Sequence, residues 1–431
     1  MAPNHGKTVL FTNDMRSKKK LKLSYIFLLL LCNLSHLLLK GQDSLKITSS
    51  FIGLDFDSAE LLKMKPTVAT HLLKVNALHR QDISNNVPLG LIWIPPVNNS
   101  RISNEPSTID WALPTNVSLP KDKDKLAFYS VSELAYLIKN KQITSLELTQ
   151  FFLDRLEKYS DTLQCTITIT DSLALSQAQR ADIEIKQGIY RGPLHGIPYG
   201  AKDLLNVAGY KTTWGANPFK SQVFSKNAEI INRLEAAGAV LVAKLTLGAL
   251  AWGDVWYGGK TRNPWDLEQG SSGSSAGSAS ATVAGLVPFA IGSETLGSIV
   301  SPSTRCGATG LRPTFGRISN DGAMALSWTM DKLGPICRNA LDCALVFEVI
   351  RGTDGKDLSV RDAPFNYHYN NEIKNLRIGV LTDDQNPDFY SENDQNTLLL
   401  LKSKGYDLVE KTLPENIPIE ALSFILEAEA A

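Results

Sequence analysis

Residues 263–318 read NPWDLEQGSSGSSAGSASATVAGLVPFAIGSETLGSIVSPSTRCGATGLRPTFGRI, which is the most informative stretch of the sequence. A Gly/Ser-rich loop passes without a break into an apolar segment at residues 281–292, and a second tight turn follows at residues 296–298. A flexible linker would have polar residues on both sides, whereas this loop leads into a segment that we expect to be buried. Small residues allow the backbone to approach its neighbours closely. The stretch therefore predicts a pocket that holds serine side chains.

Residues 263–318 resemble the signature region of the amidase signature family of serine amidohydrolases. Members of that family read NPWDL, then GGSSGGSA, an Ala-rich apolar helix, a T-D-x-G-G-S-I turn and CG..GLKPT.GR. In this chain the corresponding places hold NPWDL at 263–267, GSSAGS at 273–278, SETLGSI at 293–299 and CGATGLRPT at 306–314. The repetition of Gly and Ser allows two registers. Counting from either flank aligns the family's first motif serine with Ser274 and not with Ser271.

A second block lies upstream, where residues 192–203 read GPLHGIPYGAKD. It is similar to the family's G-P-L-H-G-I-P-x-x-x-K-D element, which carries the catalytic lysine and places it here at Lys202. Two separated motifs in the right order are far more specific than either motif alone.

The resemblance implies a mechanism in which three side chains act in line. Ser298 is the expected nucleophile, which attacks the amide carbonyl and forms an acyl-enzyme. Ser274 is expected to pass the proton from Ser298 to Lys202, which acts as the base. A lysine in water has a pKa near ~10.4, so burial and hydrogen bonds to the neutral amine must lower that pKa by about 2 to 3 units.

The resemblance also assigns supporting roles around these three residues. It implies a cis peptide bond between Gly273 and Ser274, and Ser275 as a second partner of Lys202. The oxyanion of the tetrahedral intermediate is expected to bind the backbone N–H groups of the turn, which belong to Thr295, Leu296, Gly297 and Ser298.

Without the family motifs, the same residues would have ordinary interpretations. A single lysine is usually solvated, and a serine in a tight turn is usually structural. We expect His71 and His195 to be structural, because no His and Asp spacing around Ser298 predicts a Ser-His-Asp triad. Asp203 is expected to cap or pair locally.

The chain departs from the family pattern beside the nucleophile. Many members have Asp and Arg where this chain has Glu294 and Val300, which puts in question how the turn is held. Leu296 stands where members have a glycine, and its side chain is expected to restrict the acyl group. Ala276 replaces another glycine, which is a mild change.

The composition is that of an ordinary globular protein, with 431 residues of which 43% are hydrophobic and 20% are charged. Lys+Arg and Asp+Glu each number 44, so the charge balance does not favour nucleic acid as a partner. The five cysteines are few, odd in number and without C-x-x-C spacing, so we expect buried thiols rather than a disulfide framework or a zinc site. Neither a metal nor an organic cofactor is expected.

The N-terminal residues 1–42 have the pattern of an export leader. Basic residues at 16–22 precede the apolar run YIFLLLLCNLSHLLL at 25–39, which is short for a membrane span, and Met15 is a plausible start. The poor cleavage site at residues 40–42 leaves an uncleaved membrane anchor open. In either case the basic flank is expected to stay cytoplasmic and the body to be periplasmic or extracellular.

The rest of the chain alternates helical and strand patterns, which favours an α/β fold. Residues 58–65 are expected to form a helix stopped by Pro66, and residues 88–120 an irregular segment. Helices are predicted at 130–140, 145–159, 172–188, 227–238, 396–404 and 419–431, and strands at 164–170, 239–243, 375–382 and 406–411. The sequences Ser130-x-x-Glu133 and Thr144-x-x-Glu147 read as capping boxes.

The predicted organisation has three parts: the leader at 1–42, a covering segment at 43–125 and an amidase signature domain at 126–431. For the last part the resemblance implies a large mixed β-sheet covered by helices on both faces. We expect a C-terminal part to be missing, because the final helical pattern has no cap and family members run longer.

The expected function is hydrolysis of a carboxylic amide, from a small molecule or a peptide, to a carboxylate and ammonia or an amine. Two alternatives stay open: an amidotransferase A-type subunit that passes ammonia to glutamyl-tRNA, and a catalytically inactive binding protein with the same fold. The leader and the lack of a basic face count against the first. The changes at Glu294, Leu296 and Val300 are the reason for the second.

Overall fold

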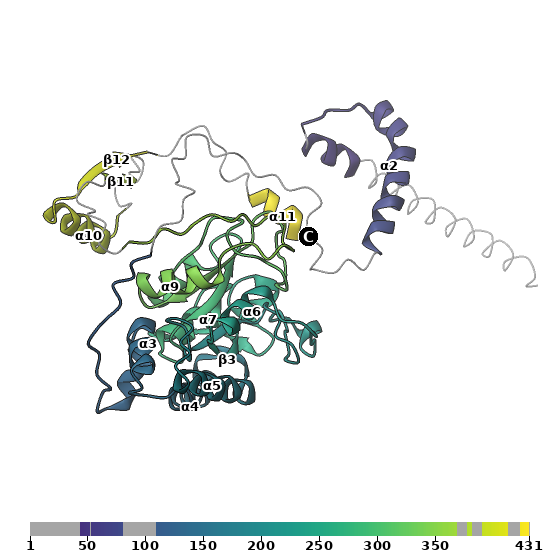
Figure 1. The fold of residues 1–431 in the computed structure, drawn as a ribbon. Helices are drawn as coiled ribbons and strands as arrows, with labels where there is room; N and C mark the ends of the chain where they lie inside the picture. Colours follow the sequence, from purple (N-terminus) through teal and green to yellow (C-terminus); the bar gives the residue numbers. More distant parts are fainter. Residues whose placement is uncertain are drawn as a thin grey trace, which may run out of the picture. The chain divides into compact units, whose positions relative to one another are not determined.

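The protein's structure is a computed structural model that describes residues 44–51, 53–80, 109–368, 377–381, 390–412 and 423–430. The chain divides into two compact units, Met1–Ser84 and Asn85–Ala431, which are described separately below. Figure 1 shows the elements in chain order. The predicted leader at 1–42 lies outside the described residues. The boundary expected at residues 125/126 stays a prediction.

In the first unit, residues 44–51 are helical and the long helix α2 spans Ser58–His79. Asp57 caps α2, since its carboxylate accepts from the backbone N–H of Ala59 and Glu60 at 2.8 and 2.9 Å. The prediction that Pro66 ends this helix is wrong, because α2 continues through it. A proline removes one backbone hydrogen bond and crowds the preceding turn, which makes a helix interior less favourable without forbidding it.

The second unit is built on a six-stranded sheet with the order β1-β3-β2-β8-β10-β9. Strand β2 pairs in parallel with β3 and β8, while the pairs β1–β3, β8–β10 and β9–β10 are antiparallel. The predicted mixed sheet is therefore confirmed. The strands are β1 (Thr166–Ile169), β2 (Pro198–Lys202), β3 (Val240–Leu245), β8 (Ala290–Glu294), β9 (Thr309–Gly310) and β10 (Lys332–Cys337).

Seven helices accompany this sheet in the described part of residues 126–368, and most lie where the sequence predicts a helix. Both predicted capping boxes are present at the starts of the first two. The helices are α3 (Val131–Lys139), α4 (Ser145–Leu163), α5 (Asp171–Lys186), α6 (Glu229–Ala236), α7 (Ala276–Val283), α8 (Val300–Cys306) and α9 (Ala340–Ile350).

Helices cover both faces of the sheet, as the alternation of buried side chains along β3 shows. Leu241 belongs to one hydrophobic cluster, which also contains side chains of α6 and α9. Val240 and Val242 belong to another cluster, with side chains of α5 and α7. In Figure 1, α9 and α5 accordingly lie on opposite sides of β3.

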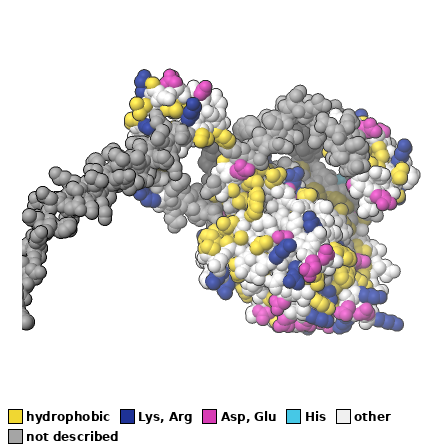
Figure 2. Space-filling view, turned by 180° about the vertical axis from the view of Figure 1, so that it is seen from behind, with side chains coloured by type: hydrophobic (Ala, Val, Ile, Leu, Met, Phe, Trp, Pro, Cys, Tyr) yellow, Lys and Arg dark blue, Asp and Glu magenta, His cyan; other side chains and the backbone are white. Residues whose placement is uncertain are grey.

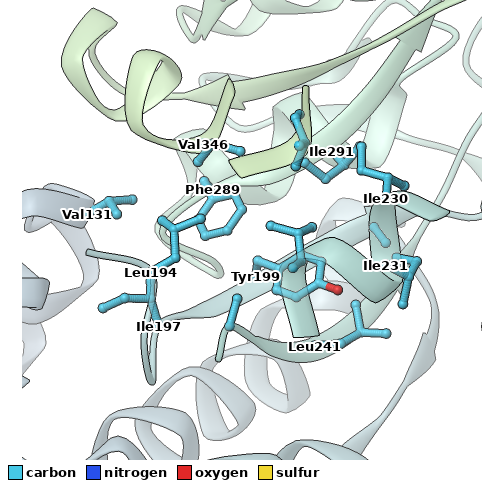
Figure 3. Packing of buried hydrophobic residues seen from close by; sticks show 14 of the residues in the cluster. Val131, Leu194, Ile197, Tyr199, Ile230, Ile231, Leu241, Phe289, Ile291 and Val346 are labelled. Atoms are coloured by element: carbon cyan, nitrogen blue, oxygen red, sulfur yellow. The ribbon is translucent and has the colours of Figure 1, made fainter. Parts of the chain in front are cut away.

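The larger cluster is shown in Figure 3, where Tyr199 of β2 lies beside Phe289, the residue before β8. Their rings are stacked, with centroids 5.4 Å apart and planes inclined by 10°. Side chains from α6 and α9 close over this pair, among them Ile230, Ile231 and Val346. The two strands that carry site residues are thus fixed against each other by a well-packed core.

Short elements connect the sheet and the helices. Two small hairpins, β4 (Val255–Trp256) with β5 (Gly259–Lys260) and β6 (Arg262–Asn263) with β7 (Asp266–Gly270), precede the Gly/Ser loop. Single 3-10 turns lie at Lys123–Phe128, Asn217–Phe219 and Ala249–Ala251.

The irregular segment before residue 121 packs against its own unit. Gln142 accepts from the backbone N–H of Leu119 and donates to the carbonyl of Val117, at 3.1 and 2.9 Å. Trp111 stacks on Tyr367 with ring centroids 5.1 Å apart. These contacts fasten the described residues 109–120, while residues 88–108 of the predicted segment lie outside the described part.

Near the C-terminus, β11 (Arg377–Leu381) and β12 (Asp407–Lys411) pair in parallel, with α10 (Glu392–Ser403) between them in sequence. The helix α11 spans Ser423–Ala430. All four segments match predicted elements within a few residues.

Cys165, Cys306, Cys337 and Cys343 are free and buried, as expected. Within the described ranges, no helix is long and apolar enough to cross a membrane. On the face shown in Figure 2, Lys and Arg side chains are interspersed with Asp and Glu side chains.

Candidate active site

Lys202 lies at the end of the central strand β2, and its side chain is fully buried. Its Nζ lies 2.8 Å from Ser274 Oγ, 3.1 Å from Ser275 Oγ, 2.8 Å from Ser293 Oγ and 3.3 Å from the carbonyl oxygen of Ser293. The structure therefore brings together Lys202, Ser274 and Ser275 as the sequence predicts. It also adds Ser293, which sequence reasoning did not assign to the base.

The serines reach Lys202 because the Gly/Ser loop folds tightly at the start of α7. The peptide bond between Gly273 and Ser274 is cis, as the family resemblance implies. A Cβ on Gly273 would lie 1.8 Å from the carbonyl oxygen of Gly253, so only glycine fits there. Ser271, the alternative in the other register, donates instead to the carbonyl of Ser272 at 2.9 Å. The geometry supports the register that starts at Ser274.

Burial changes the protonation of Lys202. Loss of solvent around the amine lowers the pKa of Lys202 to about 7, although the negative charges of Asp331 and Glu294 act in the opposite direction. A large fraction of Lys202 is therefore neutral near pH 7, and a neutral amine can accept a proton. The sequence-based expectation of a strongly lowered pKa agrees with this value.

Ser298 lies in the turn between β8 and α8, with Gly297 before it at a φ of 85°. The carbonyl of Ser298 accepts from the backbone N–H of Ser275 at 3.0 Å, which joins this turn to the loop of Ser274. The Ser298 hydroxyl is partly exposed and has no hydrogen-bond partner in the described part of the chain. It is thus open to an incoming substrate.

The turn also presents unused backbone donors. The N–H groups of Leu296, Gly297 and Ser298 donate to no group in the residues that the structure describes. Such free, preorganised donors are what an oxyanion hole requires. The Leu296 side chain is 63% exposed, so it is not part of the core.

Glu294 holds the turn between β8 and α8 in place. Its carboxylate accepts from the backbone N–H groups of Ile299 and Val300 at 2.8 and 2.9 Å. The guanidinium of Arg312 lies 3.7 Å from the same carboxylate. The longer acid therefore fixes the first turn of α8 directly, and a cation from the segment after β9 stands near it.

Asp331 is a second acid beside the turn at residues 295–298, and the sequence did not identify it as part of the site. Its carboxylate accepts from the Thr295 hydroxyl at 2.5 Å and from the backbone N–H groups of Leu326 and Ser327 at 2.7 and 3.1 Å. Burial raises the pKa of Asp331, while these hydrogen bonds oppose the rise. No local motif could have shown that this loop contacts Thr295.

Asp203 forms a buried ion pair with a residue distant in sequence, so the expectation that it caps or pairs locally is wrong. Its carboxylate lies 2.6 Å from Lys244 Nζ on the neighbouring strand β3, and both side chains are fully buried. Asp203 also accepts from the backbone N–H and the hydroxyl of Thr213 at 2.7 and 2.6 Å. Lys244 Nζ donates in turn to the carbonyl of Lys211 at 3.0 Å. The pair ties two strands to the loop around residues 211–213.

His195 and His71 lie in surroundings that differ from those of Lys202. His195 is buried, its Nδ1 accepts from the backbone N–H of Arg191 at 3.1 Å, and its Nε2 lies 3.0 Å from a Glu184 carboxylate oxygen. His71 is an exposed residue of α2. Among the described residues, no group of three or more His, Cys, Asp or Glu side chains is placed to hold a metal ion.

The chain belongs to the amidase family, the amidase signature enzymes. The sequence model of the family described as Amidase matches residues 147–431. Enzymes of this family act on the carbon–nitrogen bonds of amides.

Its relatives of known name include components of amidotransferases. The A-type subunit of the glutamyl-tRNA(Gln) amidotransferase of Methylococcus capsulatus is 38% identical over 257 residues, which are 58% of this chain and 53% of that protein. The protein of the same name from Acinetobacter baylyi is 40% identical over 58% of this chain and 52% of its own. The chain thus spans about half the length of the curated relatives it matches.

Solved structures show the same fold. The peptide amidase of Stenotrophomonas maltophilia is similar with a TM-score of 0.61 and 32% identity, over 70% of this chain and 64% of that one. The A-type subunit of the glutamyl-tRNA(Gln) amidotransferase of Thermotoga maritima has a TM-score of 0.63 and 26% identity, over 73% and 67% of the two chains.

Proposed function

We propose that this protein hydrolyses carboxylic amides through an acyl-enzyme on Ser298. The observation that carries this proposal is the buried Lys202 amine, with a pKa of about 7, at hydrogen-bond distance from Ser274. A lysine in that state has the properties of a general base, because it is neutral and held beside a hydroxyl. Membership of the amidase family supports the same chemistry.

The proposed reaction begins when Ser298 Oγ attacks the carbonyl carbon of the amide. Its proton passes to Ser274 Oγ, and the proton of Ser274 passes to Lys202 Nζ. The oxyanion binds the free N–H groups of the turn at 296–298. Lys202 then returns the proton by the same path to the leaving nitrogen, and water later releases the carboxylate by the reverse sequence of transfers.

Amidotransfer is the second candidate function. It is favoured by the relatives named as A-type subunits of glutamyl-tRNA(Gln) amidotransferase, and it uses the same attack on an amide. The leader predicted at residues 1–42 favours simple hydrolysis, since an exported enzyme would not meet charged tRNA. Formation of amidated tRNA from glutamyl-tRNA and an amide donor would indicate transfer, whereas hydrolysis yields only the carboxylate and free ammonia or amine whether or not tRNA is present.

The test of the proposed function is reaction with a serine-directed fluorophosphonate, which separates an enzyme from an inactive binding protein. We expect stoichiometric labelling of the full chain at Ser298, identified by mass spectrometry of its peptides. Ser298→Ala should abolish both labelling and amide hydrolysis while the fold is kept, because it removes only the nucleophilic oxygen. Retention of more than a few per cent of the rate would assign the attack to another residue, with Ser293 and Ser301 the first to replace.

We also propose that the body of the protein is exported, either freed from its leader or anchored by it. The order of basic and apolar residues at 16–39 supports this proposal.

A further inference from the structure

Glu429 of α11 is fastened to the loop at residues 326–331. One of its carboxylate oxygens accepts from the Ser327 hydroxyl at 2.5 Å and from the backbone N–H of Thr329 at 3.2 Å. The other accepts from the Thr329 hydroxyl at 2.7 Å. Burial opposes ionisation of Glu429, but these hydrogen bonds outweigh it and hold the pKa of the carboxyl below its ordinary value. Both oxygens of an ionised carboxylate are thus engaged by one loop.

The same loop is fastened on its other side to the nucleophile turn. Ser327 is fully buried, and its backbone N–H donates to Asp331. The carboxylate of Asp331 accepts in turn from the Thr295 hydroxyl. Thr295 lies three residues before Ser298, and its own carbonyl accepts from Lys332 Nζ at 2.9 Å. A continuous series of hydrogen bonds therefore runs from α11 to the turn that carries the nucleophile.

We propose that Glu429 is a positioning residue for the nucleophile turn, acting through the loop at 326–331 and Asp331. This inference rests on the proposed function, because it concerns how Ser298 and the free N–H groups of 296–298 are held. A free turn would sample many geometries, whereas attack and oxyanion binding require one. The ionised Glu429 restrains the loop, and Asp331 transmits that restraint to Thr295.

The packing of α11 as a whole does not account for the role proposed for Glu429. Leu426 of α11 is buried and supplies an apolar anchor, while Glu427 is exposed. The two acids thus differ in environment although they lie on the same helix. Glu427 is accordingly the matched control for Glu429.

The test compares the rate of Ser298 labelling by diisopropyl fluorophosphate in the full chain and its variants. Glu429→Ala should lower the limiting rate constant of labelling roughly tenfold, since small displacements of reacting groups cost this much or more. The half-saturating concentration of the reagent should stay unchanged. Glu429→Gln, which keeps one acceptor, should have an intermediate rate, and Glu427→Ala should equal the wild type.

A double variant tests whether the effect passes through Asp331 and Thr295. Thr295→Val removes the hydroxyl that Asp331 accepts from and leaves the backbone donor in place. If Glu429 acts along this path, Glu429→Ala adds little further loss to Thr295→Val. If Glu429→Ala only destabilised the protein, its loss of labelling rate would instead multiply with that of Thr295→Val, and the melting temperature would fall.

The outcomes separate the two proposals. A wild type that does not react with the reagent overturns the proposed function and the positioning role together. A reactive wild type overturns the positioning role alone if Glu429→Ala reacts as fast as Glu427→Ala, or if its loss multiplies fully with that of Thr295→Val. A tenfold loss that is absent from the Thr295→Val background supports the role.

Discussion

Lys202 illustrates how burial gives an ordinary side chain the properties of a base. Its motif predicts the lysine and its role by resemblance, and the register argument selects Ser274, which the structure places at hydrogen-bond distance from Lys202. The sequence could not show Ser293 or Asp331, because their contacts with the site depend on the pairing of β2 with β8 and on a loop near residue 330. Contacts between distant segments leave no local spacing to detect.

The first prediction concerns the pH dependence of acylation. Because burial lowers the pKa of Lys202 to about 7, the labelling rate of Ser298 should rise with pH and level off above about pH 8. Lys202→Ala should lose this dependence and most of the rate. Lys202→Arg should not restore it, since a guanidinium stays protonated. An unchanged profile in Lys202→Ala would make this lysine structural.

The second prediction concerns stability. The pKa of Lys202 is about 7 in the folded protein and near ~10.4 in the unfolded chain, so the unfolded chain binds an extra proton between these values. The free energy of unfolding should therefore increase with pH across this window, because the cost of the buried ammonium is present below it and disappears above it. Relative to wild type, Lys202→Met should gain roughly 4 kcal/mol more at pH ~6 than at pH ~10. Urea unfolding at both pH values measures the difference; equal gains would contradict the lowered pKa.

The ion pair between Asp203 and Lys244 joins the end of β2 to β3, and both side chains are fully buried. Lys244→Met should lower the free energy of unfolding by about 3 to 5 kcal/mol, because it leaves a buried carboxylate without its cation. The double variant Asp203→Asn, Lys244→Met should be more stable than Lys244→Met alone. Chemical unfolding of the three proteins checks this order. A single variant as stable as the double one would mean that water or Thr213 already satisfies Asp203.

Elements with strong local signals were predictable, and those governed by packing were less so. Capping boxes fix the starts of α3 and α4, and apolar periodicity gives α6 and β3. The predicted end of α2 at Pro66 is wrong, since a proline lowers the propensity for a helix interior without forbidding it. The order of the strands was beyond sequence reasoning, because it depends on which buried faces meet.

The predicted leader at residues 1–42 leads to a prediction about the location of the protein. A fusion of residues 15–45 to a reporter should deliver the reporter across the cytoplasmic membrane, because basic residues followed by an apolar run direct export. Fractionation of cells and protease accessibility measure the result. A matched fusion in which the lysines at 18–20 are replaced by glutamate should stay inside. Retention of the unaltered fusion in the cytosol would favour the amidotransferase function.

The four contacts of Lys202 Nζ exceed what a neutral amine can donate. A neutral amine has two N–H groups and one lone pair, whereas an ammonium has three N–H groups. Ser275 donates its proton to the carbonyl of Ser293, so toward Lys202 it can only accept. When the lysine loses its proton, at least one other hydroxyl must reverse its direction and donate into the lone pair. Ser274, at 2.8 Å, can make that reversal, and its oxygen then keeps its lone pairs free to accept a proton. The charge of one amine thus sets the direction of its hydrogen bonds with the neighbouring serine hydroxyls.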